Sequence, residues 1–536
     1  MSSIADPIKE GLARGWKVHG GEQGPLPATL DCDVVIIGSG AGAGITAELL
    51  AKAGLKLVII EEGPLKSSSD FRQLEAEAYP TLYQESAGRK TADKAINILQ
   101  GRCVGGSTTV NWTSSFRTPA PTLAFWGEKF GLEDFNPTTM APWFEQVERR
   151  LSVGDWAVAP NPNNEALRRG ALKLGIEAPL IRRNVKACWN LGSCGMGCPT
   201  NAKQSMLVTT IPAALDQGAT LLVQTRAERL DIQGAEVKAL WCRPVGIDGG
   251  ANGPELRITA RHFVVAGGAI NSPALLLRSV APDPHQLLGR RTFLHPTLIS
   301  SAIFDDRIEG WNGAPQTVYS DHFLHQGKID GPLGYKLESA PLHPVLMATS
   351  LVGHGAGMVE MLKQYPHSQA LLALMRDGFH PQSMGGQVGL NSDGTAVLDY
   401  PLNDVLFDGA RRAMLSMAEL QFAAGASSVI PVHELATAYK SWAEAKAGIE
   451  ALPMKPYLTR VVSAHVMGGC GMAADASRGV VRPDGQHWQL GNLSVHDGSL
   501  FPTSIGANPQ ISVYGLSNRL ATGLALRLTR KAVQLA

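Results

Sequence analysis

Two segments near the C-terminus carry side chains that could act on a hydroxyl group. One contains His465 two residues after Ser463, and the other contains Asn508 directly before Pro509. Histidine has a reference pKa of about 6.5, so at neutral pH it can accept a proton and hold a developing alkoxide by a hydrogen bond. The amide of asparagine can fix the oxygen without competing for the proton. Together the two residues could serve proton removal from an alcohol.

A glycine-rich stretch near the N-terminus predicts the element that would hold a cofactor beside them. Residues 33–37 read as a buried parallel strand, and Gly38, Gly40 and Ala43 follow with Gly-x-Gly-x-x-Ala spacing. Gly38 allows a tight turn, Gly40 lets backbone approach a pyrophosphate, and Ala43 keeps the next helix close to the strand. Glu61 ends a second predicted strand, where its carboxylate can accept the hydroxyls of an adenosine ribose. This βαβ unit predicts a dinucleotide site.

Four blocks of the sequence resemble the signatures of the glucose–methanol–choline (GMC) family of flavoprotein oxidoreductases. They are residues 101–112, which form a second glycine-rich turn, residues 262–273, and the C-terminal segments 462–472 and 492–512. The resemblance implies an FAD-binding domain and oxidation of a CH–OH donor by hydride transfer to the flavin. Residues 202–205, Ala-Lys-Gln-Ser, resemble long-chain alcohol oxidases and sterol oxidases of this family.

The resemblance also implies roles for individual residues. His465 falls on the catalytic histidine and Asn508 on its partner, whereas Asp497 falls on the acid beside the flavin diphosphate. Pro509 and Gln510 fall on backbone contacts to the ring. The other implied cofactor-binding residues are Gly38, Gly40, Ala43, Glu61, Gly105, Gly106, Ser107, Asn111 and Val223. Some relatives attach FAD through a histidine just before the asparagine of the first signature. Here that residue is Val110, so noncovalent FAD is expected.

The order of these blocks predicts a Rossmann-like FAD-binding domain built from three stretches and a second, substrate-binding domain. The fold class expected is α/β, or α+β overall, with a mostly antiparallel sheet and helices in the substrate domain. The FAD-binding stretches are 1–120, which begins with an arm over 1–31, and 201–295 and 456–536. A lid and cysteine-rich segment covers 121–200, and the substrate domain covers 296–455. Residues 408–424 are expected to form a helix.

Three of the seven cysteines, Cys188, Cys194 and Cys198, lie within eleven residues. Structural zinc normally needs four ligands, and no fourth cysteine or histidine is close, so no metal residue is assigned. The spacing is similar to that of GMC subunits with a small iron–sulfur cluster, but the usual cysteine pair is missing. A tight loop with buried thiols, or a disulfide, is the favoured interpretation.

The length, composition and net charge of the chain exclude several other classes of protein. The chain has 536 residues, 44% of them hydrophobic and 18% charged, with a formal net charge of +1. Near-neutral charge gives no reason to expect a nucleic-acid partner. No signal-peptide-like run and no apolar run long enough for a membrane span are present, so a cytoplasmic protein is expected, with peripheral membrane association possible.

The sequence therefore predicts FAD-dependent oxidation of a largely apolar primary or secondary alcohol, with oxygen or a quinone or cytochrome as electron acceptor. Sugar or glycoside oxidation on the same fold is the nearest alternative. A flavin lyase or decarboxylase of the same fold, and a flavin-binding subunit without turnover, are further alternatives. The pair of His465 and Asn508 disfavours both of these.

Overall fold

The computed structural model describes residues 4–351 and 355–535. Its first sheet has the order β1-β7-β3-β2-β10-β9-β8, with β21 also paired to β10. Six of these strands pair in parallel, namely β1, β7, β3, β2, β10 and β21. Strand β9 runs antiparallel to both of its neighbours, β10 and β8. The strands are β1 (Lys17–His19), β2 (Thr29–Ile37), β3 (Leu57–Ile60), β7 (Thr220–Leu222), β8 (Thr225–Gln233), β9 (Glu236–Pro244), β10 (Leu256–Val265) and β21 (Leu493–Val495).

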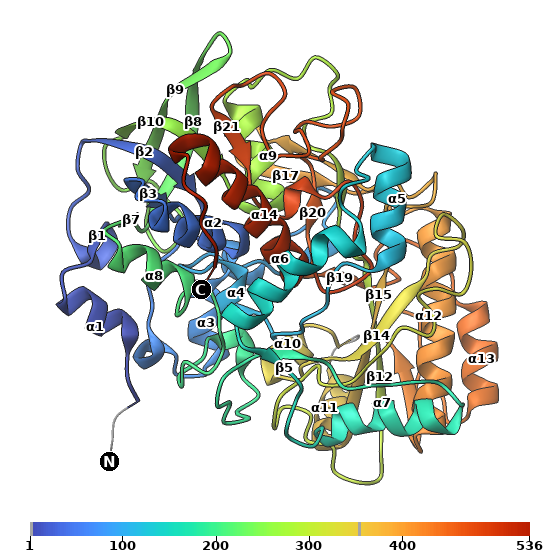
Figure 1. The fold of residues 1–536 in the computed structure, drawn as a ribbon. Helices are drawn as coiled ribbons and strands as arrows, with labels where there is room; N and C mark the ends of the chain where they lie inside the picture. The colour runs from blue at the N-terminus through green and yellow to red at the C-terminus, as the bar shows by residue number, and fades with distance from the viewer. Residues whose placement is uncertain (1–3, 352–354, 536) are drawn as a thin grey trace.

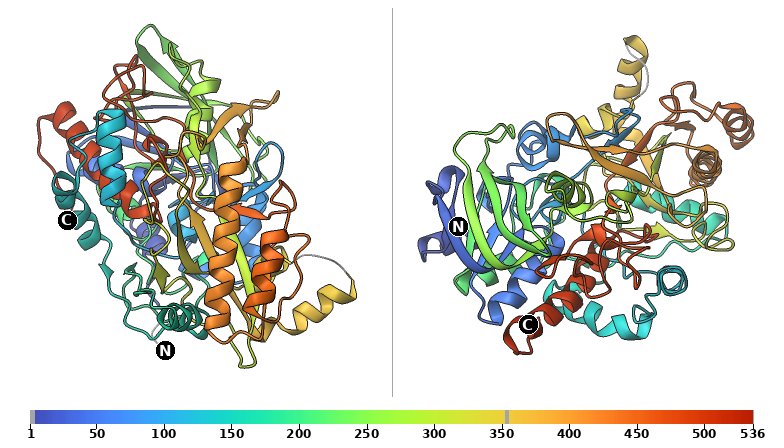
Figure 2. Two further views of the ribbon diagram at one scale, coloured as in Figure 1. Left: turned by 90° about the vertical axis from the view of Figure 1, so that its right-hand side faces the viewer. Right: turned by 90° about the horizontal axis from the view of Figure 1, so that it is seen from above.

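The central strands are buried on both faces, as their continuous apolar runs require. Val34, Val35 and Ile36 of β2 have no exposed surface. Helix α2 (Ala41–Lys52) follows β2 and packs between α14 (Gln510–Thr529) and α8 (Thr210–Asp216). The first and last parts of the chain thus form one body, with blue and red segments adjacent in Figures 1 and 2.

A second sheet has the order β13-β14-β15-β12-β19-β4, and β18 also pairs with β12. All of its pairs are antiparallel except β19 with β4. The strands are β4 (Ile96–Ile98), β12 (Thr297–Ile303), β13 (Tyr319–Ser320), β14 (Tyr335–Ser339), β15 (Ser368–Met375), β18 (Ser428–Pro431) and β19 (Val461–Ser463). Helix α12 (Asp404–Ala423) covers one face, with α7 (Pro162–Lys173) and α13 (Trp442–Ala451) beside it (Figure 2).

Two smaller sheets complete the fold. One has the order β17-β16-β11-β20, and the other pairs β5 with β6. Their strands are β5 (Val153–Gly154), β6 (Arg183–Asn184), β11 (Arg290–Phe293), β16 (Gly386–Leu390), β17 (Ala396–Asp399) and β20 (Met467–Gly468). The remaining helices are α1 (Pro7–Ala13), α3 (Glu75–Leu82), α4 (Ser107–Val110), α5 (Ala120–Phe130), α6 (Pro137–Arg150), α9 (Gly268–Arg278), α10 (Pro344–Ala348) and α11 (Ala356–Lys363).

The predicted fold class is confirmed, with differences at the ends of elements. The expected arm over 1–31 contains α1 and β1, and β1 is the parallel edge strand beside β7. Helix α12 begins four residues before the predicted start because the side chain of Asn403 caps it by accepting from the backbone of Leu406. Helix α9 begins at Gly268, so Pro273 lies inside it rather than near its start.

The predicted domain boundaries stay a prediction. Strands β4 and β19 pair in the second sheet although both lie outside residues 296–455.

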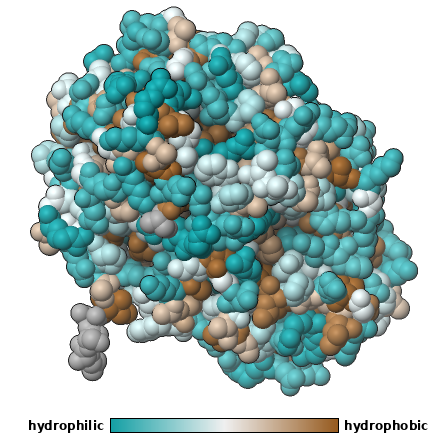
Figure 3. All heavy atoms as spheres, in the orientation of Figure 1, coloured by the Kyte–Doolittle hydropathy of each residue, from teal (hydrophilic) through white to brown (hydrophobic). Residues whose placement is uncertain are grey.

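Across the two described ranges, no helix is both long and apolar enough to cross a membrane. The face of the molecule seen in Figure 3 is mostly hydrophilic, with hydrophobic side chains in small separate patches.

Candidate active site

Two glycine turns from distant parts of the chain meet at the carboxyl end of β2. Gly38 has a φ of +112°, and a Cβ atom there would lie 2.3 Å from the carbonyl oxygen of Ala266. A Cβ atom on Gly106 would lie 2.8 Å from Cα of Gly40. Glycine at these positions leaves bare backbone beside the N-terminus of α2. Such a surface fits the pyrophosphate of a dinucleotide such as FAD.

Glu61 is held at the end of β3 with its carboxyl group ready to accept further hydrogen bonds. It accepts from Ser39 Oγ over 2.5 Å and from the amide of Gly63 over 2.8 Å, and it lines the cavity. Burial raises the pKa of Glu61 to about 7, partly offset by these two hydrogen bonds. A buried carboxyl group of this kind fits the hydroxyls of an adenosine ribose.

The raised pKa predicts how Glu61 affects the stability of the apoprotein. A carboxyl group whose pKa is higher in the folded than in the unfolded state stabilises the fold at low pH. That stability is lost as the pH rises from the unfolded value of about 4.5 through about 7. Replacing Glu61 by Gln should therefore raise the free energy of unfolding of the apoprotein at pH 8, by up to about 3 kcal/mol. Urea unfolding at pH 8 and pH 4 would measure this, and an equal effect at both values would contradict it.

A cavity of about 1340 Å³ runs from the glycine turns to the C-terminal segments and onward beside the second sheet. It collects most of the predicted site residues from separate parts of the chain. Those that line it are Gly38, Gly40, Glu61, Gly106, Ser107, Asn111, His465, Asp497, Asn508, Pro509 and Gln510.

Three predicted cofactor residues are not among those lining the cavity. Ala43 is fully buried within α2, as helix–strand packing requires, and the amide of Gly105 donates to Ser39 Oγ over 3.0 Å. Val223 uses its amide to bond the carbonyl of His19, and its own carbonyl accepts from Thr225 Oγ1. The backbone of Val223 is therefore engaged within the protein, while Thr225 lines the cavity.

Hydrogen bonds join the blocks that resemble the family signatures at the middle of the cavity. Asn111 donates from Nδ2 to Gln510 Oε1 over 2.8 Å, which joins the second glycine-rich turn to the start of α14. Asp497 accepts from the amide of Gly268 over 2.8 Å and from Ser272 Oγ over 2.5 Å. These bonds place the turn before α9 beside the C-terminal segments.

His465 follows β19 and is linked to the Asn508 loop through another histidine. Nδ1 of His465 lies 3.4 Å from Nδ1 of His295, and Nε2 of His295 accepts from the amide of Gly506 over 3.0 Å. Burial lowers the pKa of His465 to about 4, so its imidazole is neutral at pH 7. A neutral imidazole at the cavity wall can take part in proton exchange.

Asn508 contacts a buried carboxyl group behind the cavity wall. Its Nδ2 donates to Glu338 Oε2 over 3.3 Å, and Gln316 Nε2 donates to the same oxygen over 2.7 Å. Burial raises the pKa of Glu338 to about 7, with Lys336 on the same strand opposing the rise. Oδ1 of Asn508 and Oε1 of Glu338 are buried without a hydrogen-bond partner among the described residues.

Sequence reasoning missed His295 and Glu338. His295 precedes Pro296 but stands in no recognised block. Glu338 lies in β14, where Tyr335 and Leu337 alternate with the charged residues Lys336 and Glu338. That alternation is typical of a strand with one face in water, whereas all five residues of β14 are buried.

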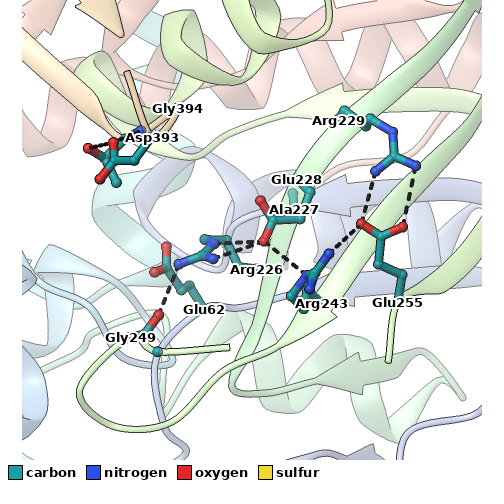
Figure 4. A network of polar contacts seen from close by, with 12 residues as sticks. Glu62, Arg226, Ala227, Glu228, Arg229, Arg243, Gly249, Glu255, Asp393 and Gly394 are labelled. Atoms are coloured by element: carbon teal, nitrogen blue, oxygen red, sulfur yellow. Dashed lines mark hydrogen bonds and ion pairs between the residues drawn. The ribbon is translucent and has the colours of Figure 1, made fainter. Parts of the chain in front are cut away.

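Arg226 and Glu228, which line the cavity, belong to a network of ion pairs that extends to Arg229, Arg243 and Glu255 (Figure 4). Arg226 pairs with Glu228 over 2.9 Å, while Glu255 pairs with Arg243 over 2.9 Å and with Arg229 over 3.0 Å. Because these guanidinium groups already have carboxylate partners, we interpret the network as one that stabilises the fold rather than as a site for an anion.

The loop that carries Cys188, Cys194 and Cys198 lies against the second glycine-rich turn, residues 101–112. Nζ of Lys203 is buried and donates to the carbonyl oxygens of Thr109, Asn111 and Cys194 over 2.7 to 2.8 Å. Cys188, Cys194 and Cys198 are free thiols. In the part of the chain that the structure describes, no three His, Cys, Asp or Glu residues are grouped to hold a metal ion.

Comparison with known proteins gives two matches to family models and several related sequences. Residues 79–297 and 381–517 match the N-terminal and C-terminal models of GMC oxidoreductases. The long-chain-alcohol oxidase FAO4B of Arabidopsis thaliana is 29% identical over 92% of this chain and 68% of its own length. The 6'''-hydroxyparomomycin C oxidase of Streptomyces lividus is 27% identical over 94% of this chain and 93% of its own.

Solved structures share the fold at lower sequence identity. A formate oxidase of Aspergillus oryzae RIB40, in a structure on FAD modification, superimposes with a TM-score of 0.69. The match covers 94% of this chain and 99% of that one at 15% identity. At this identity the likeness concerns the fold alone.

Proposed function

The chain belongs to the GMC oxidoreductase family and is an FAD-dependent oxidoreductase, and from this premise we propose that it oxidises a largely apolar alcohol to an aldehyde or ketone. The residues proposed to act on the hydroxyl group are His465 and Asn508. Both line the cavity where its nucleotide half meets the second sheet. The related long-chain-alcohol oxidases support the same substrate class.

The observation that carries the proposal is the apolar wall beyond this pair. On β15, Leu371 and Ala373 belong to the core under α12, whereas Ala370, Leu372 and Leu374 line the cavity. Side chains alternate between the two faces of a strand, so one face of the sheet forms the cavity wall. Ile299, Leu342, Met347, Leu351 and Ile430 extend that wall. A chain of methylene groups would gain about 0.8 kcal/mol for each group buried there.

The protein's own residues prepare the reaction by binding, orientation and exclusion of water. When bound, FAD supplies the ring that accepts a hydride from the carbinol carbon. The backbone at Gly38, Gly40 and Gly106 holds the pyrophosphate in this proposal, and Glu61 holds the ribose. His465 and Asn508 bind the hydroxyl oxygen and orient the alcohol for the reaction. Correct placement of the reacting groups supplies a large share of the acceleration.

We propose that FAD is bound noncovalently. Val110 lines the cavity at the position where some relatives carry the attaching histidine, and a valine side chain has no nucleophile. Oxygen is the proposed electron acceptor, in line with the oxidase names of the related proteins.

The proposal is tested by mixing the purified yellow protein anaerobically with 1-dodecanol, cholesterol and glucose. Reduction of the flavin by 1-dodecanol or cholesterol, with hydrogen peroxide formed on admission of air, supports it. Reduction by glucose alone would favour the sugar-oxidase alternative. No reduction by any alcohol would favour the lyase or non-catalytic alternatives.

A bulky side chain in the apolar wall should discriminate between long and short alcohols. In Leu372→Trp, the indole fills the space where the distal methylenes lie, so the KM for 1-dodecanol should rise about tenfold or more. The kcat/KM for 1-butanol should stay within about twofold because that substrate ends before the obstruction. Leu172→Trp, at an exposed site on α7, is the control for adding a tryptophan. Equal effects on both alcohols would remove this wall from the substrate path.

A further inference from the structure

His295 lies behind the substrate-facing histidine and has a role beyond packing. It is 1% exposed, stands two residues before β12, and contacts both His465 and the loop that carries Asn508. His295 lies outside the four blocks that resemble the family signatures. Its hydrogen bonds determine which nitrogen of His465 carries a proton.

The backbone of Gly506 fixes the tautomer of His295. An amide N–H can only donate, so Nε2 of His295, which accepts from it over 3.0 Å, must carry a lone pair. A neutral His295 then holds its proton on Nδ1. Burial, together with the positive groups of Lys336 and Arg376 and with His465, lowers the pKa of His295 and keeps it neutral.

The proton on His295 in turn fixes the tautomer of His465. It points along the 3.4 Å path between the two Nδ1 atoms, so Nδ1 of His465 is the acceptor. The proton of the neutral His465 ring is then on Nε2. This nitrogen has no hydrogen-bond partner among the described residues and is not enclosed by protein, and the ring lines the cavity.

We propose that His295 is a positioning residue that holds His465 in the Nε2–H tautomer, so that His465 meets the substrate oxygen as a hydrogen-bond donor. The proposal rests on the function proposed above and assigns His465 a role different from the base expected from the sequence. A base at Nε2 would need the proton on Nδ1, and that tautomer loses the bond from His295. The Nε2–H donor stabilises negative charge on the oxygen as the hydride leaves, as oxyanion-binding donors do.

The role of donor leaves the hydroxyl proton to another group. We assign it to Glu338, the carboxyl group that contacts Asn508 from behind the cavity wall and whose pKa of about 7 lets it bind a proton near neutral pH. The charged groups around it are Lys336 on the same strand and Asp321, which pairs with Lys336 over 2.5 Å.

Two variants of His465 separate a donor from a base. Glutamine places amide N–H groups about where Nε2 lies, but it has no basic atom that could take up a proton at neutral pH. As a donor, His465→Gln should reduce flavin with 1-dodecanol at least about tenfold faster than His465→Ala. Equal rates for the two variants, with FAD content and thermal unfolding unchanged, would overturn the proposal.

Histidine-selective ¹⁵N NMR of the holoenzyme provides a readout that does not depend on activity. The signal of His465, assigned by its loss in His465→Gln, should show the proton on Nε2 at pH 8. In His295→Leu the signal should shift toward a mixture of the two tautomers. A proton on Nδ1 of His465 in the native protein would overturn the proposal, even if His295→Leu fails to fold. Failure of every alcohol to reduce the flavin would instead count against the proposed function. The tautomer measured by NMR would remain valid, because it does not depend on activity.

Discussion

Replacement of His465 by alanine should leave a folded, yellow protein whose flavin is reduced by 1-dodecanol about 10²–10³ times more slowly. The imidazole of His465 lines the cavity and is linked through His295 to the Asn508 loop, and alanine cannot donate a hydrogen bond to the substrate oxygen. FAD binding should persist because the glycine turns and Glu61 are contributed by other elements. Anaerobic stopped-flow absorbance measures the rate.

The exposed His285 provides a matched control for this variant. His285→Ala should reduce flavin at the native rate, so a general effect of losing a histidine can be recognised. A His465→Ala protein with near-native reduction would remove His465 from the chemistry, whatever its tautomer.

Replacement of Gly40 by alanine should weaken FAD binding by about 10- to 100-fold while the apoprotein remains as stable as the native one. Gly40 has a φ of −73°, which alanine adopts without strain. The added Cβ would lie 3.8 Å from Cα of Gly106, an ordinary contact distance. The methyl group would therefore meet no protein atom too closely, and its cost would arise where the pyrophosphate approaches the backbone.

Flavin fluorescence titration of the apoprotein gives the affinity, and thermal unfolding gives the stability. Gly523→Ala is the control, because a Cβ atom there has nothing within 4 Å. Native-like FAD affinity in Gly40→Ala would place the pyrophosphate elsewhere. A large loss of apoprotein stability would show that the methyl group disturbs the fold itself.

The nucleotide-binding half could be predicted from the sequence because its signals are local. A run of branched apolar residues, two glycines at fixed spacing and a helical pattern occupy one continuous stretch, and their structure follows from it. The cap of α12 is equally local, but the helix predicted over 408–424 leaves out Asn403 and the first turn that it caps. The β1 strand was missed because three residues at a sheet edge leave almost no periodic pattern.

The substrate half was predicted only in outline, since antiparallel pairing between distant strands leaves no local pattern. β12 pairs with β15, β18 and β19, which lie far along the chain. His295 and Glu338 escaped prediction for a related reason. The role of each residue depends on partners that only the fold brings close. His295 contacts Gly506 and His465, whereas Glu338 contacts Asn508 and Gln316.

The position of β21 and α14 has a consequence for biosynthesis. β21 pairs with β10, and α14 packs on α2, so residues 493–529 complete a sheet and helix layer begun near the N-terminus. During translation the early strands leave the ribosome long before these partners exist, which exposes apolar surface that chaperones would bind. The cofactor pocket is therefore completed only once residues 493–529 have been synthesised, and a chain terminated before β21 would lack the segment that carries Asp497, Asn508 and Gln510.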